Sequence, residues 1–112
     1  MAPQIARRPT PADKSSIAAF ERKAAQAARL LKLLANENRL LILCRLAAVC
    51  EMSVSDLAEA VHLSQSAVSQ HLGRMREDGL VGTRRDAQTI YYRLADPNAT
   101  RLLALLQDIY CP

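Results

Sequence analysis

Three cysteines, Cys44, Cys50 and Cys111, are the side chains of this sequence with the most reactive chemistry. A thiolate can attack sulfur or bind a soft metal ion, whereas an odd number of cysteines does not suit a framework of structural disulfides. Cys44 lies four residues after Leu40 in an apolar helical pattern, where a cysteine is more often a small core residue than a sensor. Cys111 stands at the predicted end of the last helix and cannot be central core, so its presence calls for a partner.

A second set of candidate residues shares one face of a helix predicted over residues 64–78. Val68, Leu72 and Met75 recur at helical spacing and predict a face packed on the core, while the opposite face is small and polar. A small polar face fits a major groove about 12 Å wide, where Ser and Gln can bond base edges or phosphates. For this helix alone, a solvated surface explains the pattern equally well. The DNA-contacting residues predicted here are Gln65, Ser66, Ser69, Gln70, His71 and Arg74.

The segment after Gly79 favours the DNA-binding interpretation. Gly79 is typical of a helix terminator, and the β-branched and aromatic residues on both sides of a polar stretch then predict a β-hairpin up to residue 94. The predicted hairpin tip bears Arg84, Arg85 and Gln88. A helix-turn-helix followed by such a hairpin has the order of a winged helix, whose wing reaches DNA backbone or minor groove. We therefore expect double-stranded operator DNA as a partner and add these three residues to its binding set.

The remaining elements are predicted from periodicity and capping residues. Helices are expected over residues 15–34, 36–49, 54–61 and from Pro97 to the terminus, with Ser or Asn and Asp residues as N-caps. Residues 1–14, with prolines and paired arginines, are interpreted as a flexible basic arm. Residues 15–112 then form one winged-helix domain of mainly α class with a small β-hairpin.

Composition excludes several other classes of protein. The net charge of +4 is modest, but basic residues gather in the first 35 residues and again over residues 64–95, as expected for an anionic partner. No apolar run approaches the roughly 18 residues of a membrane span, and the start resembles no secretory signal, so a cytoplasmic protein without a membrane partner is expected. Neither a nucleophile–base spacing nor a Gly-rich phosphate loop is apparent, so we expect no enzyme and no cofactor.

The stretches "LLKLLANENRLLIL", "LSQSAVSQHLGRMREDGLV" and "RRDAQTIYYRL" together resemble the ArsR/SmtB family of bacterial winged-helix repressors, over residues 28–112. The order and spacing of the three motifs make this resemblance specific. It implies a homodimer formed by the first and last helices, with the helix after Ser64 reading an operator. It also implies that an effector or a thiol reaction weakens DNA binding.

The resemblance also allows the effector site to be compared residue by residue. Arsenic and cadmium sensors of the family carry Cys-x-Cys where this chain has Ser53-Val54-Ser55, and the last helix lacks the histidines of the zinc sensors. His71 is interpreted as a packing or DNA-contacting residue because no ligand cluster surrounds it. No metal site is therefore predicted.

The positions of Cys44 and Cys111 resemble the persulfide-sensing and redox-sensing branch of the family. In that branch a disulfide or polysulfide bridge joins the two cysteines when the inducer appears, so the resemblance implies that reactive sulfur species link Cys44 to Cys111 and release the operator. Cys50 is interpreted as a bystander. Three alternatives stay open: a general oxidant sensor that forms a plain disulfide, a thiolate sensor of metals or organometals, and a DNA-binding module without an effector.

Overall fold

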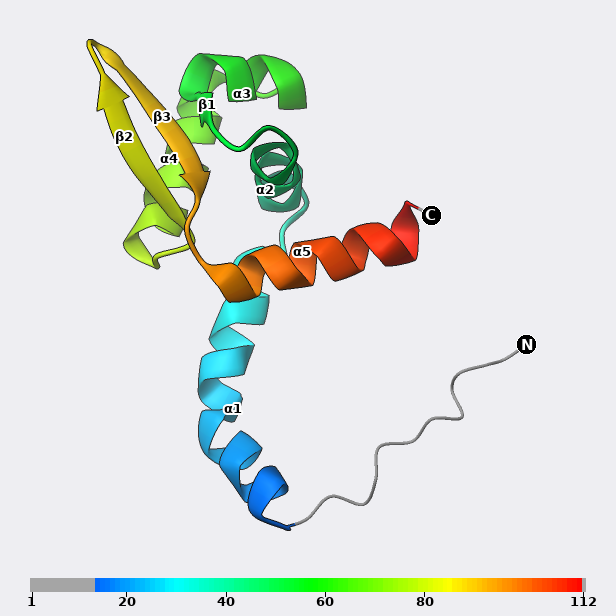
Figure 1. The fold of residues 1–112 in the computed structure, drawn as a ribbon. Helices are drawn as coiled ribbons and strands as arrows, with labels where there is room; N and C mark the ends of the chain where they lie inside the picture. The colour runs from blue at the N-terminus through cyan, green and yellow to red at the C-terminus, as the bar shows by residue number, and fades with distance from the viewer. Residues whose placement is uncertain (1–13, 112) are drawn as a thin grey trace. The chain divides into compact units, whose positions relative to one another are not determined.

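The structure is a computed structural model that describes residues 14–111 (Figure 1). The predicted basic arm lies outside the described residues except for Lys14, where the first helix begins. The chain divides into two units, one up to Leu31 and one from Lys32 onward. The elements in order are α1 (Lys14–Leu34), α2 (Glu37–Val49), β1 (Met52–Ser53), α3 (Val54–Val61), α4 (Gln65–Glu77), β2 (Val81–Asp86), β3 (Thr89–Leu94) and α5 (Pro97–Tyr110).

Four helices begin at the capping residues expected from the sequence. The side chains of Asn36, Ser53 and Ser64 each accept a hydrogen bond from the backbone N–H three residues later, at 3.1, 3.2 and 3.1 Å. Asp96 caps α5 by accepting from the N–H of Asn98 at 2.8 Å, with Pro97 in the first turn. Each cap satisfies a backbone donor that the helix itself leaves without a partner.

The end of α4 is fixed by Gly79, as predicted. Gly79 adopts a φ of 78° and donates its N–H to Arg76, while the N–H of Leu80 reaches back to the carbonyl of Met75. These two bonds form a Schellman motif, which needs a left-handed residue that glycine adopts without a steric penalty. The motif turns the chain directly into β2, so α4 and the hairpin are joined by a short, well-defined turn.

The sheet holds one strand more than predicted. β2 and β3 form the expected antiparallel hairpin, and β1 adds to the other edge of β3, where Met52 faces Tyr92 and Ser53 faces Tyr91. A two-residue strand is too short to leave a periodic signal in the sequence. The fold class, mainly α with a small hairpin in winged helix-turn-helix order, is confirmed, and the predicted two-strand topology gains β1.

The core lies among α2, α3, α4, α5 and the start of the hairpin. Its fully buried side chains are apolar and come from all of these elements: Ile42, Leu43, Leu46, Leu57, Val68, Leu72, Met75, Leu80 and Leu103. α3 packs on both α2 and α4, and α2 also packs against α5. This core holds α4 by one face and leaves its other face to solvent.

Candidate DNA interface and thiols

α4 presents the two faces that its sequence predicts. Val68, Leu72 and Met75 are completely buried, which anchors the helix along its whole length. Five of the six predicted contact residues lie exposed on the opposite face: Gln65, Ser66, Ser69, Gln70 and Arg74. The sixth, His71, lies at the margin of that face and is half-buried. Since the anchored face fixes how the helix is rotated, the polar face forms a rigid exposed surface.

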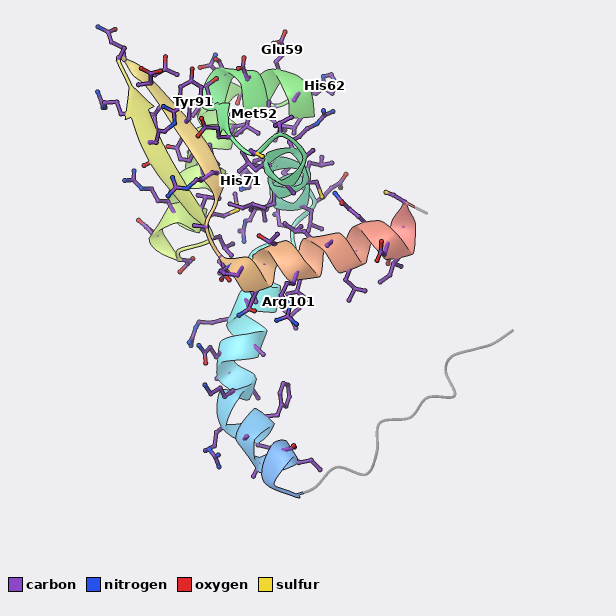
Figure 2. The ribbon with its side chains drawn as sticks, in the orientation of Figure 1. Met52, Glu59, His62, His71, Tyr91 and Arg101 are labelled. Atoms are coloured by element: carbon purple, nitrogen blue, oxygen red, sulfur yellow. The ribbon has the colours of Figure 1, made fainter. Side chains whose placement is uncertain are left out.

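The connection between α3 and α4 makes the tight turn of a helix-turn-helix. His62 ends α3 in the left-handed conformation, with φ 59° and ψ 43°, and its N–H bonds the carbonyl of Ala58. Figure 2 shows His62 at the end of α3, near Glu59. Ser64 then caps α4 two residues later. His62 therefore serves the turn through its backbone, although histidine carries a steric cost in this conformation.

The wing places its two arginines differently from the prediction. Asp86 faces Thr89 across the hairpin, so the loop is Ala87–Gln88, and Arg84 and Arg85 lie in β2 rather than at the tip. Gln88 does lie at the tip. The difference arises because the hairpin closes with a two-residue loop, the tightest common connection, which moves the arginines into the strand.

Arg84 interacts with two other side chains of the domain, Glu51 and Tyr91. Its guanidinium donates from Nε to both carboxylate oxygens of Glu51, at 3.1 and 3.2 Å, and from Nη2 at 2.5 Å. It also lies 4.9 Å from the centre of the Tyr91 ring, at cation–π distance. Figure 2 shows Tyr91 close to Met52, where β1 joins the wing. Sequence reasoning missed Glu51, because no local pattern connects residues 33 positions apart.

The salt bridge between Glu51 and Arg84 stabilises the charge of both side chains. The hydrogen bonds from Arg84 hold the pKa of Glu51 below its ordinary value, so the carboxylate stays ionised. Within residues 14–111 the salt bridges involve Arg84 alone, with Glu51 and Asp86 as partners. Arg85 is exposed and forms no salt bridge there. Among the described residues, no carboxylate therefore competes with a phosphate for Arg85.

His71 lies among positive charges. Burial lowers the pKa of its imidazole below the ordinary value of 6.5, and the charges of Arg39 and Arg74 lower it further. The ring is therefore neutral at pH 7, with one nitrogen as donor and the other as acceptor. Arg39, from the first turn of α2, is a second residue that sequence reasoning missed.

The three cysteines are all free thiols. Cys44 lies half-buried on α2 next to the buried Leu43, and Cys111 is exposed as the residue that ends α5, its N–H bonding the carbonyl of Gln107 at 2.7 Å. Cys111 thus follows the last helical turn rather than lying in it. Figure 1 shows α5 crossing beside α2, and these two helices pack together.

Cys50 differs from the other two cysteines in its backbone conformation. It is exposed, with φ 74° and ψ −49°, and the N–H of Glu51 bonds the carbonyl of Val49 at 2.8 Å. These values describe a γ-turn, a strained conformation for a residue with a side chain. In the described part of the chain no three His, Cys, Asp or Glu side chains gather as a group that could hold a metal ion.

Among the helices of residues 14–111, none combines the length and the apolar character needed to cross a membrane.

Comparison with known proteins gives a consistent result. Residues 36–83, from the cap of α2 into β2, match the model of the "bacterial regulatory protein, arsR family". The transcriptional activator HlyU of Vibrio cholerae is 48% identical over 82% of this chain and 84% of its own length. The biofilm growth-associated repressor of Agrobacterium fabrum is 45% identical over 83% of this chain and 79% of its own.

A solved structure supports the same relationship. The structure described as reduced HlyU from Vibrio cholerae superposes with a TM-score of 0.78 at 47% identity, covering 83% of this chain and 97% of that one. These similar proteins have the names of transcriptional regulators, in agreement with the expectation of a protein that is not an enzyme.

Proposed function

Because this chain belongs to the ArsR family of bacterial transcriptional regulators, we propose that it is a dimeric repressor that reads an operator with α4 and the wing while Cys44 and Cys111 are reduced. Reactive sulfur species then link the two thiols and release the DNA. The relatives include both an activator and a repressor by name, so the direction of control is part of the proposal.

The observation that carries DNA reading is the division of α4 into two faces. One face is fixed by the fully buried Val68, Leu72 and Met75, and the other offers exposed hydroxyl and amide groups without bulky side chains. Such groups bond base edges when a helix enters the major groove. The exposed Arg85 and Gln88 of the adjoining wing supply the flanking backbone contacts.

Dimer formation is supported by apolar side chains that a single chain leaves in water. On α5, Leu105 and Ile109 are 54% and 57% exposed and lie one helical turn apart. On α1, Ile17 and Phe20 are also exposed. Exposed apolar surface of this kind is typical of an interface, and a two-fold dimer presents two α4 helices to two half-sites about 34 Å apart.

The thiol switch rests on the neighbouring positions of α2 and α5. A thiolate of Cys44 or Cys111 attacks the outer sulfur of a small persulfide, takes that sulfur and releases a thiol. When both residues carry a persulfide, one attacks the other, expels hydrogen sulfide and leaves a trisulfide bridge. Tying α2 to α5, the helix proposed to form the dimer, changes the spacing of the two α4 helices and weakens operator binding.

The test combines DNA binding with mass measurement on the same sample. Reduced protein should shift a duplex that carries the operator, and treatment with glutathione persulfide should abolish that shift. Peptide mass spectrometry should then find Cys44 and Cys111 joined within one subunit by a bridge that contains added sulfur.

Three other results would each contradict the sulfur inducer. Release by hydrogen peroxide with a plain disulfide, and no release by persulfide, would indicate a general oxidant sensor. Release by a thiophilic metal ion without oxidation would indicate a thiolate metal sensor. Binding that none of these reagents changes would leave a DNA-binding module without an effector.

A further inference from the structure

A pocket opens beside the exposed face of α4, and Arg39 is a charged residue of its lining that the proposed function does not use. The pocket has a volume of about 600 Å³ and is walled on one side by Ser69, Gln70 and Gly73 of α4. Arg39 closes it from the first turn of α2, so it joins two helices of the same structural unit.

Arg39 lines this pocket without a carboxylate partner in the described part of the chain. Its Nη1 donates to the carbonyl of Leu33 at 3.0 Å, but its Nε is buried and has no hydrogen-bond partner. Within residues 14–111 Arg39 also forms no salt bridge. A guanidinium is always charged, so a side chain that lines an open pocket and has no carboxylate partner among the described residues is suited to bind an anion.

Besides Arg39, the ionisable side chains around the pocket are Arg74, His71 and Glu77, and His71 is neutral at pH 7. Arg74 and His71 of α4 line it, and His71 is close enough to both arginines for their charges to affect its titration. Glu77 adds one carboxylate at the lining, but it pairs with neither arginine in the described structure. Two guanidinium groups and one imidazole thus face one open space.

We propose that Arg39, with Arg74 and His71, forms a binding site for a phosphate group of the DNA backbone beside α4. The inference rests on the proposed DNA-binding function and assigns one further contact to it. A phosphate accepts several N–H bonds at once, and a planar guanidinium matches its oxygens with two parallel donors.

The position of the pocket favours a phosphate of DNA over a free anion. Its wall is made of Ser69, Gln70 and Gly73, which belong to the face of α4 that is proposed to enter the groove. A strand whose base edges meet Gln70 brings its own phosphates past the same face. The site therefore fixes the register of the helix on the duplex without reading sequence.

The test is the salt dependence of DNA binding. Each phosphate contact contributes about 0.9 to the slope of log affinity against log salt concentration. Arg39→Gln should lower that slope by about one unit, equally on operator and on random duplex, and Arg39→Lys, which keeps the charge, should retain most of it. Arg45→Gln is the matched control, because Arg45 is an exposed cation of the same helix that does not line the pocket.

A second measurement works even where Arg39→Gln lowers stability through its lost bond to Leu33. The measurement uses a series of duplexes, each with one backbone phosphate replaced by a neutral methylphosphonate. At one position the replacement should weaken binding of the unmodified protein but not binding of the Arg39→Gln variant. Such coupling arises only where the missing charge and the missing cation face each other.

The outcomes separate this inference from the function on which it rests. If the unmodified reduced protein binds no duplex, the proposed function fails and the phosphate site with it. If that protein binds but Arg39→Gln keeps the full salt slope and no methylphosphonate position couples to it, only the phosphate site is wrong. Tight binding of inorganic phosphate by isothermal titration, with an unchanged DNA slope, would overturn it in favour of a free anion.

Discussion

Glu51 and Arg84 form a two-point salt bridge that ties the connection between α2 and α3 to the wing. Glu51 directly follows Cys50, the residue of the strained γ-turn, and Arg84 also stacks on Tyr91 of β3. The pairing therefore connects the wing to the segment between α2 and β1. It also occupies one of the two arginines that DNA would otherwise attract.

Glu51→Gln should strengthen binding to any duplex and steepen its salt dependence. The change removes a negative charge near the DNA and frees Arg84 for a phosphate. Melting temperature should change little, because a salt bridge at the surface contributes little to stability. Fluorescence anisotropy over a salt series measures the effect. Weaker binding would instead indicate that the pair is needed to hold the wing in place.

Gln70→Ala should lower affinity for the operator by about 1–3 kcal/mol and affinity for random DNA much less. The reason is that the amide at the centre of the exposed face of α4 is proposed to bond a base edge. Arg85→Ala is the contrasting variant, since loss of a phosphate contact should weaken both duplexes alike. Equal losses on the two duplexes for Gln70→Ala would exclude direct base reading.

Cys44→Ser and Cys111→Ser should each bind the operator when reduced but no longer release it with persulfide, because one thiol cannot form a bridge. Cys50→Ser should respond as the unmodified protein does. Gel shift and intact mass on the same samples measure both properties. The two-thiol mechanism is wrong if both single variants remain fully inducible.

His71 should titrate below the ordinary histidine range, because its burial and the charges of Arg39 and Arg74 lower its pKa. A depressed histidine pKa makes the folded state bind fewer protons than the unfolded chain, so its contribution to stability is present above about pH 6.5 and falls as the pH drops toward the folded pKa. Arg39→Gln should raise the pKa of His71 measured by NMR of the ring protons. An unchanged pKa would mean that the two side chains do not share the pocket.

Ile109→Asp should convert the dimer to a folded monomer, since it places a charge in the apolar surface that α5 is proposed to bury. Gln107→Asp, on the same helix at an exposed polar residue, should leave the dimer intact. Light scattering coupled to size exclusion gives the mass, and circular dichroism checks the fold. A persistent dimer with Ile109→Asp would place the interface elsewhere.

The helices, the hairpin and the apolar and polar faces of α4 could be predicted from the sequence, whereas the short strand β1 could not. The caps at Asn36, Ser64 and Asp96, the stop at Gly79 and the buried face of α4 were all predictable, because they depend on residues a turn apart along one helix. The winged-helix order and the exposed face of α4 followed from the same local signals. The three cysteines and their types were likewise plain in the sequence.

Which charged groups pair with each other became visible only in the folded structure. The pairing of Glu51 with Arg84, the addition of β1 to the sheet and the approach of Arg39 to α4 all join segments that are separate along the chain. No periodicity records such contacts, since they depend on how helices and strands pack against one core. That packing brings Glu51 to Arg84, so Arg84 is paired within the chain. It also brings Arg39 beside α4, which makes Arg39 a candidate for DNA contact.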